Sequence, residues 1–342
     1  AVSSTGGHIS LDAGRDLLQN AGITAGGAGK SVDVLAGGDV TMAAGTGITS
    51  ADGNARVEAG GSVALRSISA GSGHVAVLAT MGAIVDADDN DSVNVTATDL
   101  ILQAGAGVGS GSNAIETGVS TLAVGAGTGG VFVTERDALV VDAVDFDVSR
   151  VNAEANIITQ NSTLEDVRTT ADWDGTIVLI TGGDLTLNAG SDSRAAVVAE
   201  GSGNVRLDVT GALTLNAELD AGSGHLSLLA TGTLTQAASG DVTTSGTGTL
   251  DVQANAIAMA GEAVTSAGSG NVRYVATDTL ALGALSTGGN VSLSAASITD
   301  SNDMAMNVSA NQLRIVTTGT DDGQGGGTSN DALEIDVDRL AA

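Results

Sequence analysis

A short unit recurs along this chain of 342 residues, and its spacing constrains the fold more than any other feature. Each copy has a glycine, then His, Asn or Thr, then an aliphatic residue that starts an alternation of apolar and polar positions. Residues 7–11, Gly-His-Ile-Ser-Leu, form one copy, and residues 224–228, Gly-His-Leu-Ser-Leu, form another. Ile9, Val32 and Ala55 begin successive units at equal steps. Self-similarity at a period of roughly 20 residues is typical of repeat architectures.

Each unit contains three short strand signals, separated by Gly, Asp, Asn or Ser. Alternation along a strand places one set of side chains inward and the other outward. Strands this short, at this period, favour a coil in which each strand pairs in parallel with its counterpart one turn away. We therefore predict an all-β fold, a parallel β-helix (β-solenoid) with three short strands in every repeating coil. By analogy with most β-helices, we expect a right-handed coil.

The composition fits stacked coils. The chain has no proline, which agrees with ladders in which every position donates its N–H. Aromatic residues make up only 1%, so the interior must be built from small aliphatic side chains. The absence of cysteine excludes disulfides, thiol nucleophiles and cysteine-based zinc sites. No apolar run approaches the ~18–20 residues of a membrane-spanning helix, and we expect no membrane insertion.

A longer repeat is superimposed on the short one. Residues 53–57 match residues 270–274 at an offset of 217, and similar matches link 7–124 with 224–342. Asn94 matches Asn307 at an offset of 213, and Glu116 matches Glu334 at 218. We predict partial super-repeat copies at 1–124 and 217–342, flanking coils at 125–216 that include an irregular aromatic and acidic segment. We expect such a piece to come from a longer tandem array.

Four segments carry a resemblance to a known family. Residues 37–42 (Gly-Gly-Asp-Val-Thr-Met), 60–65 (Gly-Gly-Ser-Val-Ala-Leu), 70–75 (Ala-Gly-Ser-Gly-His-Val) and 182–190 resemble the repeats of filamentous-haemagglutinin-like giant bacterial surface proteins. The resemblance implies an extracellular or cell-surface adhesin stalk that acts in adhesion, biofilm formation or surface contact, and not an enzyme. Because coil ends expose strand edges, we also expect self-association along a fibre. A host or matrix polysaccharide or protein is the other expected partner.

Charge narrows the partners further. Asp and Glu number 40 against 12 Lys and Arg, which gives a net charge of −28. Phosphate backbones are bound by Lys and Arg, so a nucleic-acid partner is not expected. Histidine has a structural interpretation: His8, His74 and His225 occupy the unit position that holds Asn or Thr in other coils. We interpret them as corner residues that cap backbone groups.

An acidic loop is the best candidate for a metal site. Residues 86–91 read Asp-Ala-Asp-Asp-Asn-Asp, and their super-repeat counterpart, residues 300–303, reads Asp-Ser-Asn-Asp. Oxygen ligands at this density suit Ca²⁺, although the spacing is not that of an EF-hand. The candidate ligands are Asp86, Asp88, Asp91, Asp300, Asn302 and Asp303. The alternative is a solvated acidic loop without a metal.

Residues 125–180 interrupt the regular pattern and hold three of the four aromatic residues. Carboxylates beside an aromatic ring are typical of sites that bind or hydrolyse sugars. Asp145, Asp147 and Trp173 are therefore candidate ligand-binding residues, although the acids could equally be the outward positions of ordinary strands. The alternative function is a carbohydrate-active β-helix enzyme or a polysaccharide-binding module centred on this segment. We assign no catalytic residue.

Overall fold

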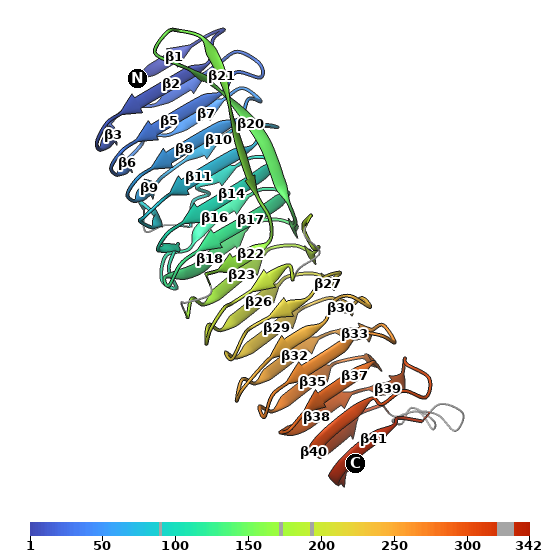
Figure 1. The fold of residues 1–342 in the computed structure, drawn as a ribbon. Helices are drawn as coiled ribbons and strands as arrows, with labels where there is room; N and C mark the ends of the chain where they lie inside the picture. The colour runs from blue at the N-terminus through green and yellow to red at the C-terminus, as the bar shows by residue number, and fades with distance from the viewer. Residues whose placement is uncertain (89–90, 171–173, 192–194, 320–331) are drawn as a thin grey trace. The chain divides into compact units, whose positions relative to one another are not determined.

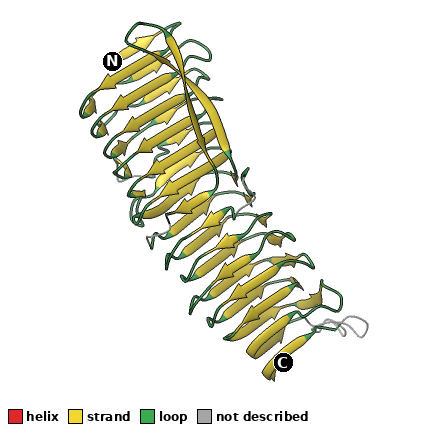
Figure 2. Cartoon of the chain, viewed as in Figure 1, coloured by secondary structure: helices red, strands yellow, loops and turns green. Residues whose placement is uncertain are grey.

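The computed structural model describes residues 1–88, 91–170, 174–191, 195–319 and 332–342. These residues form strands and loops without a helix, and the strands stack in parallel as a β-solenoid, which confirms the predicted fold class (Figure 2). No helix long and apolar enough to cross a membrane occurs in the described ranges. Contacts divide the chain into two compact units, Ala1–Thr170 and Ala171–Ala342. The super-repeat boundaries and the hand of the coil stay predictions.

In the first unit, three parallel ladders form the faces of the coil (Figure 1). The first ladder comprises β2 (Ile9–Ala13), β5 (Val32–Ala36), β8 (Ala55–Ala59), β11 (Val75–Ala79), β14 (Asp99–Ala104) and β17 (Thr121–Ala126). The second comprises β3 (Leu17–Gln19), β6 (Val40–Met42), β9 (Val63–Leu65), β12 (Ile84–Asp86), β15 (Gly107–Val108) and β18 (Gly130–Glu135). The third comprises β1 (Val2–Ser4), β4 (Ile23–Ala25), β7 (Ile48–Ser50), β10 (Ile68–Ser69), β13 (Val95–Thr96) and β16 (Ile115–Gly118).

One rung of the first ladder is split by an insertion. β19 (Leu139–Val141) pairs with the start of β17, and β22 (Val167–Thr169) pairs with its end. Between them the chain forms an antiparallel hairpin, β20 (Val144–Val151) and β21 (Ile157–Leu164), which lies across the strands of the first unit (Figure 1). On β17 only Ala123 separates the residues opposite Val141 and Val167. The hairpin therefore interrupts this rung in the sequence, while both halves of the rung keep their register with β17.

The second unit repeats the three ladders. Its first ladder comprises β23 (Ile177–Thr181), β26 (Val205–Val209), β29 (Leu226–Ala230), β32 (Leu250–Ala254), β35 (Val272–Ala276) and β38 (Asn290–Ala295). The second comprises β24 (Leu185–Leu187), β27 (Leu213–Leu215), β30 (Thr233–Gln236), β33 (Ala256–Met259), β36 (Thr279–Leu282) and β39 (Ser297–Asp300). The third comprises β25 (Val197–Val198), β28 (Leu219–Asp220), β31 (Val242–Thr244), β34 (Val264–Ala267) and β37 (Ala284–Thr287). The long strands β40 (Val308–Thr317) and β41 (Ile335–Ala341) pair with each other.

The interior of the coils is aliphatic, as the alternation predicts. In β8 the side chains of Ala55, Val57 and Ala59 are buried, while the two between them face outward. Tyr274, the single tyrosine, adds a fully buried ring to this interior. Its hydroxyl lies 2.7 Å from the Thr265 hydroxyl, so its polar group keeps a hydrogen bond inside the coil.

Glycine and capping side chains explain the repeated corner motif. A Cβ at Gly248 would overlap the carbonyl oxygen of Gly224 one coil away, so the backbones approach more closely than any other residue allows. The next residue caps the neighbouring coil. His8 Nδ1 accepts a hydrogen bond from Ser31 N at 3.1 Å, and Asn204 Oδ1 accepts one from His225 N at 2.8 Å. His225 Nδ1 likewise accepts from Thr249 N at 3.2 Å, so the capping interpretation holds for His8 and His225, whereas His74 Nδ1 lies 2.8 Å from Asp99 Oδ2 and caps no backbone group that the structure describes.

Candidate functional sites

The hairpin rests on the solenoid through an apolar contact. Val144, Phe146 and Val148 project from one side of β20, because alternate residues of a strand share a face. They form a buried cluster with three outward-facing residues of successive rungs, which are Ala76, Ile101 and Ala123. The Phe146 ring is 7% exposed, and its centroid lies 5.2 Å from that of the His74 ring. This face of the solenoid is therefore covered by the chain's own hairpin.

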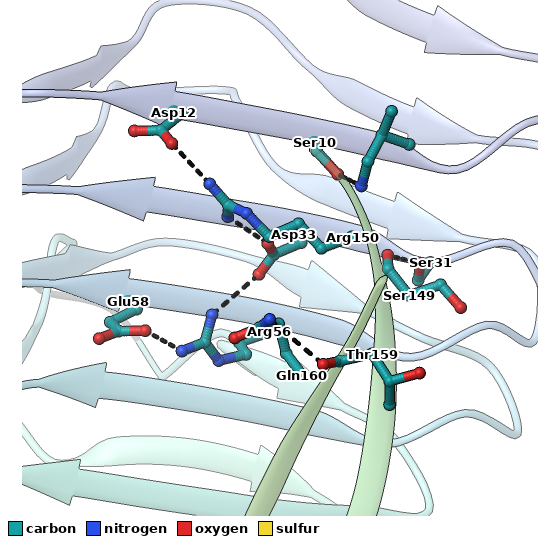
Figure 3. Close-up of polar contacts among 11 residues, drawn as sticks. Ser10, Asp12, Ser31, Asp33, Arg56, Glu58, Ser149, Arg150, Thr159 and Gln160 are labelled. Atoms are coloured by element: carbon teal, nitrogen blue, oxygen red, sulfur yellow. Dashed lines mark hydrogen bonds and ion pairs between the residues drawn. The ribbon is translucent and has the colours of Figure 1, made fainter. Parts of the chain in front are cut away.

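Farther along β20, an ion-pair network fastens the hairpin (Figure 3). Asp33, whose side chain is 0% exposed, lies between two arginines. Arg150 of the hairpin pairs with Asp33 Oδ2 and also places Nη2 2.7 Å from Asp12 Oδ2. Arg56 of the next rung places Nη1 3.1 Å from Asp33 Oδ1, and Nη2 of the same side chain pairs with Glu58. A buried carboxylate needs such partners, so Asp33 depends on the hairpin for one of its two cations.

Backbone contacts complete the attachment. Asn54 Nδ2 donates a hydrogen bond to the carbonyl oxygen of Asp147 at 2.7 Å, and Val151 N donates one to Ser10 Oγ at 2.7 Å. The Ser31 hydroxyl donates to the carbonyl oxygen of Ser149 (Figure 3). Together with the apolar cluster and the ion pairs, these bonds connect the hairpin to the first ladder from β2 to β17.

The residues beneath the hairpin form a column in register, which we call the dock column. It consists of Ser10, Asp33, Arg56, Ala76, Ile101 and Ala123. The corresponding positions of the second unit are Val178, Arg206, Ser227, Asp251, Arg273, Ser292 and Arg314. These seven side chains are exposed or half-buried, and all except Val178 are polar or charged. In this column, three successive apolar residues and a fully buried acid therefore occur beneath the hairpin.

The hairpin also holds two of the candidate ligand-binding residues. Asp145 and Asp147 lie on the exposed side of β20, and both accept hydrogen bonds from Asn161 Nδ2, at 2.8 and 3.1 Å. The structure thus places these carboxylates side by side on an exposed strand. Trp173 lies outside the described residues. The sugar-binding hypothesis stays a prediction.

Three polar residues of the first unit are joined by hydrogen bonds, and we call them the first acidic corner: Asp86, Asn94 and Glu116. Asn94 is fully buried and donates from Nδ2 to Asp86 Oδ1 at 2.7 Å, while its Oδ1 accepts from Glu116 N at 2.9 Å. Asp86 Oδ2 and Glu116 Oε2 are shielded from solvent and have no hydrogen-bond partner among the described residues. Burial, and then the nearby charge of Asp86, raise the pKa of Glu116 to about 7.

The second acidic corner, consisting of Asp300, Asn307 and Glu334, repeats this arrangement. Asn307 is fully buried and donates from Nδ2 to Asp300 Oδ1 at 2.8 Å. Its Oδ1 accepts from Glu334 N at 2.8 Å. Asp300 Oδ2 and Glu334 Oε2 are again shielded and lack a hydrogen-bond partner in the part of the chain that the structure describes. In both corners, the aspartate Oδ2 and the glutamate Oε2 therefore lack a hydrogen-bond partner among the described residues.

The other predicted metal ligands have different surroundings. Asp88 Oδ2 lies 2.9 Å from Arg66 Nη2, and Asn302 N donates to Asp300 Oδ1 at 2.8 Å. Asp91 and Asp303 are exposed. Within the described ranges, no group of three or more His, Cys, Asp or Glu side chains is placed to hold a metal ion. The calcium hypothesis for the full loop stays a prediction.

Sequence reasoning missed the two asparagines and the two glutamates of these corners as site residues. The signal that would have found them is their recurrence in the two super-repeat copies, Asn94 with Asn307 and Glu116 with Glu334. Comparison of the chain with family models, with curated proteins and with solved structures finds no match.

Proposed function

We propose that this chain is a stalk segment of a secreted or cell-surface bacterial fibre, which extends an acidic rod for adhesion, biofilm formation or surface contact. The solenoid fold is compatible with this role and with others, so the proposal needs a more specific observation. That observation is the hairpin. In a solenoid each coil contacts only its neighbours, so coils can peel away one at a time under load. A strap bonded to the rungs from β2 to β17 opposes such peeling.

The polar residues around the hairpin support the same proposal. Asp33, Arg56 and Arg150 resemble a charged catalytic cluster in composition, yet their contacts are with one another, between rungs and hairpin. Corner side chains such as Asn204 likewise bond one coil to the next. Groups used in this way stabilise a scaffold.

Mechanical unfolding tests the load-bearing part of the proposal. The full chain would be pulled from its ends, beside a variant in which one serine replaces residues 142–166. One residue suffices because Ala123 alone separates the residues opposite Val141 and Val167 on β17. We expect the rungs beneath the hairpin to release together at higher force in the natural chain and one by one in the variant. Identical force-extension curves would contradict a strap.

A separate experiment tests whether the protein lies on the cell surface or is secreted. Antibodies against the chain would be applied to intact and to lysed cells of the organism that encodes it. The proposal requires labelling of intact cells or of shed fibres. Labelling that appears only after lysis would refute it, whatever the mechanical result.

A further inference from the structure

The two acidic corners are built alike, although nothing in the coil geometry requires an acid at these positions. In each, a buried asparagine joins an aspartate side chain to the backbone of a glutamate in the following coil. The asparagine also donates to a carbonyl oxygen of the preceding coil, that of Arg66 in the first corner and that of Gly283 in the second. Each asparagine therefore holds an aspartate and a glutamate from successive coils in fixed relation.

Each corner also contains shielded carboxylate oxygens that lack a hydrogen-bond donor among the described residues. Asp86 is 7% exposed, and its Oδ2 receives no hydrogen bond from a donor among the described residues. Burial, and also the adjoining Asp88 carboxylate, raise the pKa of Asp86, and Asp88 Oδ1 is shielded and without a donor as well. The glutamate of that corner, which has a shielded Oε2 of its own, experiences the charge of Asp86. Leaving a buried acceptor without a donor is unfavourable, and more so when the acceptor is charged. A bound cation would remove this penalty at each corner.

The surroundings of the two corners differ, which makes their agreement informative. Arg66 stands beside the first corner and pairs with Asp88. The super-repeat position of Arg66 is occupied by Gly283 in the second corner, so this position supplies no arginine there. Despite this difference, the aspartate Oδ2 and the glutamate Oε2 are the unpartnered carboxylate oxygens that both copies share within the described ranges. The recurrence therefore belongs to the three residues that the corners share and does not depend on Arg66.

We propose that each acidic corner binds one divalent cation of the Ca²⁺ type, held by Asp86 Oδ2 and Glu116 Oε2 in the first corner and by Asp300 Oδ2 and Glu334 Oε2 in the second. Ca²⁺ takes about 6–8 oxygen ligands and accepts main-chain oxygens and water among them. Each corner then supplies two carboxylates, and water can fill the other coordination positions. The cation links two successive coils at each corner. This inference does not rest on the fibre proposal.

Calorimetry on the full chain, freed of metal with a chelator and titrated with CaCl₂, tests the stoichiometry. We expect two saturable sites. The variant Asp86→Asn with Glu116→Gln keeps one site, the variant Asp300→Asn with Glu334→Gln keeps the other, and the combined variant keeps none. These substitutions are nearly isosteric and leave the glutamate backbone N–H that the asparagine uses. Circular dichroism checks that each variant retains its β-sheet signal.

Two controls separate specific sites from the general acidity of a chain with a net charge of −28. Asp251→Asn removes an acid that is paired with Arg273 in the second unit, and it must leave both sites intact. Thermal unfolding gives an independent readout, because a ligand bound only to the folded state raises Tm. Ca²⁺ should raise the Tm of the natural chain and not that of the combined variant. Undiminished binding in the combined variant, or no saturable binding in the natural chain, would overturn the proposal.

Discussion

Removing the arginine that fastens the hairpin should loosen the hairpin without unfolding the coils beneath it. Arg150→Met removes the charge but keeps most of the side-chain volume. It deprives Asp33, which is fully buried, of one of two cations, while Arg56 stays 3.1 Å from Asp33 Oδ1. Breaking a buried ion pair costs about 3–5 kcal/mol, and since one partner remains we expect roughly half, ~2 kcal/mol. The contact of Arg150 with exposed Asp12 adds little.

Hydrogen exchange followed by mass spectrometry measures this loss locally. Exchange of protected amides reports the free energy of the opening that exposes them, and each ~1.4 kcal/mol changes it about tenfold. A loss of ~2 kcal/mol therefore predicts that amides of β20 exchange about 30-fold faster. Those of β11 and β14 should change far less, because their ladder bonds remain.

The second unit provides a matched control. Arg206 occupies the corresponding column and pairs with Asp208 at 2.6 Å, but the two side chains are 52% and 37% exposed. Exposed pairs contribute about 0.2–1 kcal/mol, so Arg206→Met should speed exchange in β26 by no more than about fivefold. If Arg150→Met changed β20 no more than Arg206→Met changes β26, the buried network would not be what holds the hairpin.

Three further outcomes follow from the corners, the core and the hairpin surface. Gly248→Ala should destabilise the second unit by about 1–3 kcal/mol, because the new Cβ would overlap a carbonyl oxygen of the preceding coil. Thermal unfolding measures this loss. Gly14→Ala is the control and should cause no such loss, because a Cβ there meets nothing within 4 Å. Burial raises the pKa of Tyr274 above its ordinary 10.0, so stability present below that pH is lost as the pH rises further. Phenolate absorbance should therefore appear only together with loss of the β-sheet circular dichroism signal, and its appearance in the folded chain would show that the ring is accessible. Changing Asp145 and Asp147 together to Asn should leave retention and turnover of anionic polysaccharides unchanged, because both carboxylates already bind an amide of the hairpin; loss of either property would support a sugar site.

The coils could be predicted from sequence because their determinants are local and repeated. The step along the chain from Ile9 to Val32, which recurs from Val32 to Ala55, is also the pairing of these residues in the ladder. The capping histidines His8 and His225 were recognisable because Asn and Thr replace them in other coils and satisfy the same backbone groups. The coil spacing and the corner residues recur in many coils, so the shared pattern is visible although individual residues differ between coils.

The hairpin escaped prediction for a physical reason. Val144, Phe146 and Val148 alternate with polar residues as a solenoid strand does, and alternation alone says nothing about the partner strand. The apolar side of β20 packs against outward-facing residues of the solenoid, and the alternation does not reveal this contact. Arg150 pairs with Asp33, which lies far earlier in the chain, so the sequence around Arg150 does not reveal its partner. The feature occurs once, so no internal comparison could expose it.

The acidic corners lie between these cases. The sequence identified Asp86 and Asp300 through their acidic loops, where carboxylates are dense. It missed Glu116 and Glu334 because these glutamates lie in the following coil, outside the acidic loops and far along the chain from their aspartates. Only the stacking of coils brings the backbone of each glutamate to the asparagine that also holds its aspartate.

The split rung has a consequence for how such chains diversify. Val141 and Val167 pair with β17 on either side of the position opposite Ala123, so a stretch of different length can join them while both keep their register with β17. The rung therefore acts as a grafting position, where a binding loop or a whole small domain can be carried on the side of the solenoid. Engineers could use it in the same way, provided that the graft supplies new cover for Ala76, Ile101 and Ala123 and a cation for the buried Asp33.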